Sequence, residues 1–133
     1  MKQEENVRII QQAYEEFGRG NIPAILNMLA DDVEWTDAGY PDLPFAGNRR
    51  GKTQVEDFFI RLNEYVQFTR FEPQSFICEG NTVVTTGYFE GQSKSTSKGF
   101  RSDWAMVWKV ENGKITYHYS YIDTAAVAGA LKA

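Results

Sequence analysis

Hydrophobic residues recur at helical spacing near the start of the chain. The first stripe, with steps of three or four residues, consists of Val7, Ile10, Tyr14 and Phe17. This spacing predicts an amphipathic helix. The helix is expected to end at the glycines of positions 18 and 20, because glycine readily adopts the left-handed conformation of a helix C-cap.

Two more helices follow from capping residues and apolar spacing. Asn21 is expected to cap the second helix, with Pro23 in its first turn, and the pair Asp31–Asp32 to end it. The inner face of this helix carries Ile25, Met28 and Leu29. A loop rich in proline and glycine is predicted over residues 38–51. The third helix after it buries Val55, Phe58, Phe59 and Leu62.

Strand patterns account for most of the remaining chain. Residues 33–37 alternate between apolar and polar, which predicts a half-buried strand. Four longer runs, rich in β-branched and aromatic residues, lie at about 65–78, 81–90, 98–110 and 114–123. The pair Asn112-Gly113 favours a tight hairpin turn, and residues 125–133 suit a short tail helix. This order predicts one α+β domain over residues 1–133.

Composition and charge argue against several classes of function and site. The 133 residues carry a net charge of −4, which argues against a nucleic-acid partner. The short basic stretch Arg49, Arg50 and Lys52 is interpreted as solvated turn residues. The single cysteine, Cys78, permits neither an internal disulfide nor a cysteine-rich zinc site.

The expected setting is the cytoplasm, with a soluble protein and no membrane partner. The first ten residues lack the apolar run of a secretory signal, and no stretch approaches the roughly 20 apolar residues that span a bilayer. No glycine-rich phosphate motif or nucleotide fingerprint is present, so no cofactor is expected.

Four stretches resemble the nuclear transport factor 2-like superfamily, which includes ketosteroid isomerases, SnoaL-like polyketide cyclases, scytalone dehydratase and limonene epoxide hydrolase. They are AYEEFGRGNIPAILNMLADDVEWTDAG, PFAGNRRGKTQVEDFFIRL, WAMVWKVENGKI and YHYSYIDTAAVAGAL. The resemblance implies a cone, in which a strongly curved mixed sheet wraps around three helices and leaves a pocket at its open end. It also implies dimers that form through the outer face of the sheet.

Alternation along the last two strands suggests which side chains enter that pocket. Trp104, Met106, Trp108 and Val110 share one face, which is expected to point inward. Matching Gly113-Lys114-Ile115 to the equivalent turn of ketosteroid isomerases places His118, Ser120 and Ile122 inside. The outer, dimer-forming face would then hold Tyr117, Tyr119, Tyr121, Ala105 and Val107, with Arg101 and Asp103 as an interface or strand-pair ion pair.

Asp37 is the first candidate catalytic residue. It continues the apolar strand face of Val33 and Trp35, where partial desolvation makes a carboxylate a better proton acceptor. In the resemblance it matches, without gaps through ADDVEWTDAG, the general base of ketosteroid isomerases. The alternative is a strand-end aspartate that accepts hydrogen bonds from the following loop.

His118, the only histidine, is the second candidate. Histidine can both donate and accept a proton near neutral pH, so His118 could act as the acid beside Asp37. The alternative is a wall residue that hydrogen-bonds Ser120 or a tyrosine. One histidine and one aspartate do not form a typical metal-ligand set, so no metal site is expected.

Other catalytic groups that the resemblance implies are missing. The two oxyanion-hole positions of ketosteroid isomerases align to Ala13, next to Tyr14, and to Met106 or Ala105. The epoxide-hydrolase triad would need acidic and basic residues near Gly87, Phe89 and Ser120. In SnoaL-like cyclases the acid/base is an aspartate near the end of the last strand, where this chain offers His118 or Ser120.

Three hypotheses for function therefore stand at the level of sequence. The first is a cofactor-free isomerase, cyclase or dehydratase acting on a small apolar carbonyl compound, with Asp37 as base and His118 as acid. The residues expected to hold the ligand are Tyr14, Trp35, Tyr88, Trp104, Met106, Trp108 and Ser120. The second is a non-catalytic binding protein with the same pocket, and the third is a dimeric interaction domain whose cone is filled.

Overall fold

The computed structural model describes residues 2–133 as helices and strands in the predicted α+β order. The first half contains α1 (Lys2–Gly18), α2 (Ile22–Met28), β1 (Leu29–Asp37), β2 (Gly47–Arg50) and α3 (Lys52–Tyr65). The second half contains β3 (Val66–Glu79), β4 (Thr82–Ser93), β5 (Gly99–Glu111), β6 (Lys114–Tyr121) and α4 (Thr124–Leu131).

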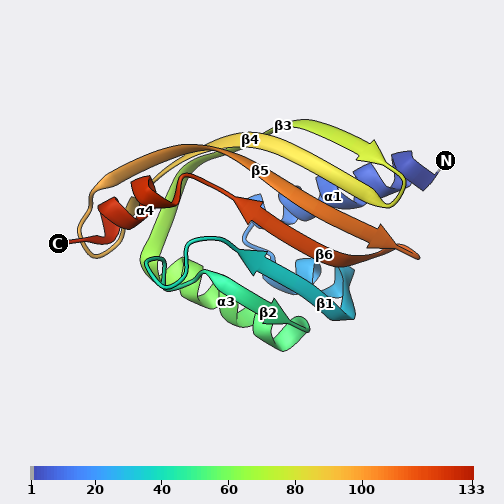
Figure 1. Cartoon of the computed structure of the whole chain (residues 1–133), viewed down its shortest axis with the longest axis horizontal. Helices are drawn as coiled ribbons and strands as arrows, with labels where there is room; N and C mark the ends of the chain where they lie inside the picture. Colours follow the sequence, from blue (N-terminus) through green and yellow to red (C-terminus); the bar gives the residue numbers. More distant parts are fainter. Residues whose placement is uncertain (1) are drawn as a thin grey trace.

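One strongly curved sheet forms the body of the molecule. Its strand order is β2-β1-β6-β5-β4-β3, and every neighbouring pair is antiparallel except β1 and β6, which run parallel. The sheet bends around α1 and α3, while α4 lies at the end of the molecule opposite the N-terminus (Figure 1). This is the expected mixed sheet on helices, with the predicted tail helix as a fourth helix.

Local signals explain the turns that were predicted. The Asn21 side chain accepts a hydrogen bond from the backbone N–H of Ala24 and so caps α2. Asn112 and Gly113, both with positive φ of 52° and 78°, form the hairpin between β5 and β6. No helix within residues 2–133 is both long and apolar enough to cross a membrane.

The predicted end of the second helix is wrong. α2 ends at Met28, and Leu29 begins β1, where it pairs with Ile115 of β6. Leu29 is buried in the strand, as it would have been on the inner face of a helix. Helical periodicity alone does not separate the two, because a partner strand distant in the sequence decides the conformation.

The predicted loop over residues 38–51 contains an edge strand, and its arginines differ from one another. Arg49 lies opposite Trp35 in the β1–β2 pair, so it projects to the concave side, with only 10% of its side chain exposed. It donates a 2.7 Å hydrogen bond to the Phe45 carbonyl oxygen and lies over the Phe58 ring. Burial lowers its pKa. The interpretation of Arg49 as a solvated turn residue is therefore wrong, while Arg50 is exposed.

The predicted strand faces are confirmed in β5 and β6. Trp104 and Trp108 are buried on the concave side, whereas Asp103 and Lys109 are exposed. In β6, inward and outward residues alternate: His118 and Ser120 are buried, while Tyr121 is half exposed, and Tyr117 and Tyr119 are partly covered. An irregularity in the β5–β6 pairing lies before Tyr117, so it does not alter the alternation from Tyr117 onward.

Candidate functional site

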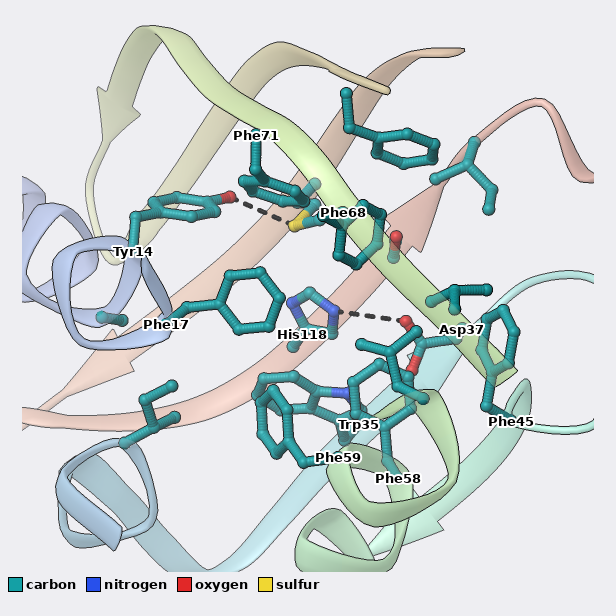
Figure 2. Close-up of a pocket in the computed structure, with 18 of the residues that line it drawn as sticks. Tyr14, Phe17, Trp35, Asp37, Phe45, Phe58, Phe59, Phe68, Phe71 and His118 are labelled. Carbon is teal, nitrogen blue, oxygen red and sulfur yellow. Dashed lines mark hydrogen bonds and ion pairs between the residues drawn. The ribbon is translucent and has the colours of Figure 1, made fainter. Parts of the chain in front are cut away.

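An apolar cavity of about 90 Å³ lies on the concave side of the sheet, against α1 and α3 (Figure 2). Eight phenylalanines line it, and the polar side chains that reach it include Tyr14, Asp37, His118 and Ser120. The volume is below the roughly 150 Å³ of an engineered cavity that admits benzene. A six-membered ring therefore enters only if wall side chains move outward.

Asp37 and His118 meet at this cavity. They come from the parallel pair β1 and β6, in which Asp37 is opposite Ser120 and Trp35 is opposite His118. The His118 Nε2 atom lies 3.7 Å from Asp37 Oδ1, which is within ion-pair distance but too long for a hydrogen bond. The prediction that both side chains face one cavity is confirmed.

Aromatic rings fix the orientation of His118. Its imidazole stacks on Trp35, with centroids 3.9 Å apart, and leans against Trp108 at 4.4 Å. Only 2% of His118 is exposed. Because the ring is held on two sides, its two nitrogens point in set directions, one toward Asp37 and one into the rest of the interior (Figure 2).

Three buried polar atoms at the cavity have no hydrogen-bond partner within residues 2–133. They are Asp37 Oδ2, His118 Nδ1 and the indole nitrogen of Trp35. Buried polar groups are nearly always hydrogen-bonded, and an unpaired one costs about 1–3 kcal/mol. Their clustering at one apolar cavity provides acceptor and donor positions for a polar end of a bound molecule.

Tyr14 belongs to a second polar group in the interior. Its hydroxyl lies 2.5 Å from Thr85 Oγ1 and 3.1 Å from the sulfur of Met106, and it accepts a hydrogen bond from Trp108 Nε1. Burial raises the pKa of Tyr14 well above its ordinary value. Tyr14 therefore stays a neutral phenol, able to donate or accept a hydrogen bond but not to act as a base at neutral pH.

Thr85 was missed at the level of sequence. It is fully buried on the inner face of β4, together with Val83 and Phe89, and the alternation along 83–89 is a signal that could have identified it. Arg49 gave no comparable signal, because the two prolines and three glycines around it indicated a loop.

The residues predicted to hold a ligand separate into two sets. Tyr14, Trp35, Met106, Trp108 and Ser120 line the cavity. Trp104 is buried but does not line it; its ring stacks on Tyr14 and Phe71, and it occupies the space that a side chain at Gly87 would need.

The prediction that Tyr88 lines the pocket is wrong. Inward positions on β4 are the odd-numbered ones, so Tyr88 lies on the outer face, under the guanidinium of Arg70 at 5.4 Å. Both faces of β4 carry apolar or β-branched residues, so composition did not reveal which face was concave.

No group of three or more potential metal ligands occurs in the part of the chain that the structure describes. The pair Asp37–His118 is thus surrounded by aromatic and aliphatic side chains rather than by further acidic or imidazole groups.

Comparison with known proteins yields a family and several similar folds. The family model of the SnoaL-like domain matches residues 10–118. An NTF2-like protein from Burkholderia xenovorans is 33% identical, with 98% of each chain covered and a TM-score of 0.88. An NTF2-like protein of unknown function from Burkholderia pseudomallei is 26% identical, covering 97% of this chain and 98% of its own, with a TM-score of 0.90.

TerC, co-crystallised with polyporic acid, is 24% identical, covering 97% of this chain and 99% of its own, with a TM-score of 0.87. At this identity the likeness concerns the fold alone. No curated protein matches the sequence.

Proposed function

Because the chain belongs to the SnoaL-like domain family, we propose that its cavity binds a small, mainly apolar carbonyl compound on which Asp37 and His118 move a proton. The observation that supports this most is the pair of unpartnered atoms, Asp37 Oδ2 and His118 Nδ1, at one apolar cavity. No cofactor takes part in the proposed reaction. Tyr14, Trp35, Met106, Trp108 and Ser120 hold the ligand.

The proposed chemistry is the formation of an enol. Asp37 Oδ2 takes a proton from the carbon beside the carbonyl, and the electron pair of the broken C–H bond becomes the carbon–carbon double bond. The carbonyl π electrons pass to oxygen, which receives a proton from His118 Nδ1. Asp37 has then gained one proton and His118 has lost one. Protonation of a different carbon by Asp37 and return of the hydroxyl proton to His118 complete an isomerisation.

The position of Asp37 decides which nitrogen of His118 serves the ligand. Nε2 faces the carboxylate at 3.7 Å, and the proposed reaction places a hydrogen on this nitrogen in both the neutral and the charged ring. Nδ1 then donates only in the imidazolium form and accepts in the neutral form. In the proposed reaction His118 thus acts as an acid from its imidazolium form, with the Asp37 carboxylate 3.7 Å from Nε2.

Hydrogen exchange of a simple ketone tests the proposed reaction without knowledge of the natural substrate. In D₂O, the α-protons of cyclopentanone are expected to exchange faster with the protein than in buffer alone, as followed by ¹H NMR. Exchange at the buffer rate, over a range of pH that covers titration of the histidine, would count against the proton-transfer role.

A non-catalytic binding protein is the second candidate. The observation that favours it is that Ala13 and Met106, which cannot donate a hydrogen bond from their side chains, line the cavity at positions where the resemblance to ketosteroid isomerases implies oxyanion-hole donors. Binding of small ring compounds without any exchange of α-protons would support this candidate over the first.

The response of His118 to a ligand is a direct test of cavity binding. Phenol, whose hydroxyl can reach one of the unpartnered atoms, is expected to shift the ring signals of the only histidine by NMR. Asp37→Asn should shift the same signals, because it removes the charge 3.7 Å from Nε2. Ring signals that respond to neither change would mean that His118 does not take part in binding.

We further propose that the chain forms a homodimer through the outer face of the sheet. This face holds Ala105, Val107, Tyr117, Tyr119 and Tyr121. Half of Tyr121 is exposed, and its ring stacks on Tyr119 at 4.4 Å. Tyrosine is enriched at interfaces because its ring is apolar and its hydroxyl polar.

Light scattering at micromolar concentration is expected to give about twice the chain mass of 15.2 kDa. Tyr121→Glu should shift the protein toward the monomer, whereas Tyr40→Glu, on an exposed loop, should not. A wild-type monomer would argue against this face as an interface.

A further inference from the structure

A groove of about 870 Å³ lies on the surface next to the cavity, between the end of α1, α2, α3 and the start of β3. Groove and cavity share part of their walls, including Tyr14, Phe17, Phe59, Phe68 and Phe71. The two spaces therefore adjoin along one layer of shared side chains, which is mainly aromatic and also contains Leu62 and Val66.

Phe17 is the centre of this layer. Its ring centroid lies 5.0 Å from that of Phe71, 6.0 Å from that of Phe68 and 6.1 Å from that of Phe59. Phe17, Phe68 and Phe71 are only half-buried, whereas Phe45, near Asp37 on the opposite side of the cavity, is 5% exposed (Figure 2). The less buried side of the cavity is thus the side toward the groove.

The groove combines apolar side chains with the positive charge of Lys94. Ile22, Pro23 and the exposed Ile60 contribute its apolar surface. At one end, Lys94 Nζ donates hydrogen bonds to the backbone oxygen and Oδ1 of Asn63, which are neutral acceptors. Lys94 forms no salt bridge with any residue between positions 2 and 133.

The other charges of the groove leave Lys94 uncompensated. Arg70 also lines the groove, but its guanidinium is already paired with Glu72 and Glu90 at 2.7 and 3.2 Å. Glu56 precedes Asn63 by seven residues on α3, which places the two about 10 Å apart along the helix axis. An anionic group is therefore favoured at the Lys94 end and not at the Glu56 end.

We propose that the groove and the cavity form one binding site for an elongated amphiphile with a ring at one end and a carboxylate at the other. The ring occupies the cavity, an apolar chain passes Phe17 into the groove, and the carboxylate lies beside Lys94. The placement of the ring rests on the function proposed for the cavity, whereas the groove and its charge are independent of it.

A matched pair of ligands tests whether the charge of Lys94 binds the carboxylate. 5-Phenylvalerate and the uncharged 5-phenylpentan-1-ol have the same ring and chain length, and their affinities can be compared by calorimetry. The carboxylate is expected to bind about two- to fivefold more tightly at low salt, as for an exposed ion pair, and the preference should shrink at high salt. Lys94→Met should abolish the preference, whereas Lys98→Met, in the same hairpin but outside the groove, should leave it unchanged.

The proposal that a ligand passes Phe17 on its way between groove and cavity is tested by the rate of binding. Phe17→Leu reduces the central ring of the wall while keeping an apolar side chain, and it is expected to raise the association rate of 5-phenylvalerate by at least about threefold in stopped-flow fluorescence. Phe76→Leu, the same substitution outside both the cavity and the groove, should leave that rate unchanged.

The outcomes separate the two proposals. Equal affinity for acid and alcohol, or a preference that survives in Lys94→Met, would overturn the assignment of the groove. Phenol is too short to span cavity and groove. If phenol shifts the His118 signals while the carboxylate preference is absent, only the groove assignment fails. If phenol leaves the His118 signals unchanged, the cavity function fails, and with it the placement of the ring.

Discussion

Asp37→Asn is expected to slow the exchange of cyclopentanone α-protons by about 10²–10⁴-fold, the range typical for loss of a general base. The amide has nearly the same shape as the carboxylate but cannot accept the proton. Asp37 is buried beside His118, at 3.7 Å, and its Oδ2 atom has no other partner within residues 2–133. The rate is measured by loss of the α-proton signal in D₂O.

The same substitution elsewhere provides the control. Asp103→Asn changes an exposed aspartate on the outer face of β5 and should leave the exchange rate at the wild-type value. If Asp37→Asn exchanged as fast as the wild type, the base would have to be another group. If both variants lost activity, the cause would be loss of folding rather than loss of the base. Circular dichroism of each variant would distinguish these two causes.

Trp108→Ala is expected to lower the free energy of unfolding by about 3–5 kcal/mol, as for the truncation of a fully packed aromatic ring. Trp108 is 3% exposed and packs against Tyr14, Trp35 and His118. Its indole N–H also donates to the hydroxyls of Tyr14 and Thr85. Chemical denaturation gives the loss directly, and phenol binding is expected to weaken because the ring lines the cavity.

Trp108→Phe separates packing from hydrogen bonding. It keeps an aromatic ring but removes the indole donor, so it should cost less than about 2 kcal/mol, the order of one or two neutral hydrogen bonds. A loss below about 1 kcal/mol for Trp108→Ala would mean that the ring is poorly packed and that the interior is looser than its burial indicates.

Local patterns in the sequence were sufficient for most of the fold. The stripe from Val7 to Phe17 forms α1, and Asn21 caps α2, because helix periodicity and capping depend on residues only a few positions apart. Where pairing with distant strands overrides local preference, prediction failed. Leu29 joins β1 rather than α2, and the segment of Arg49 becomes β2, since each finds a strand partner.

For the site, the sequence indicated which side chains share a face of a strand, but not which residues from other elements they contact. Strand alternation and apolar character correctly placed Trp108 inside, and the resemblance to ketosteroid isomerases did so for the face shared by His118 and Ser120. Tyr88 was assigned to the wrong side, because β4 is apolar on both faces and only the curvature of the sheet makes one of them concave. The inward turn of Arg49 likewise depends on its pairing opposite Trp35.

The sequence by itself determined the elements and which side chains share a face, because the periods of 3.6 and 2 are local properties of the backbone. Only the tertiary structure decided how closely Asp37 and His118 approach, at 3.7 Å, since the parallel pairing of β1 with β6 joins segments far apart in the chain. The mainly aromatic layer shared by cavity and groove was decided in the same way: Phe17 of α1 contacts Phe59 of α3 and Phe71 of β3, and no local pattern encodes these contacts.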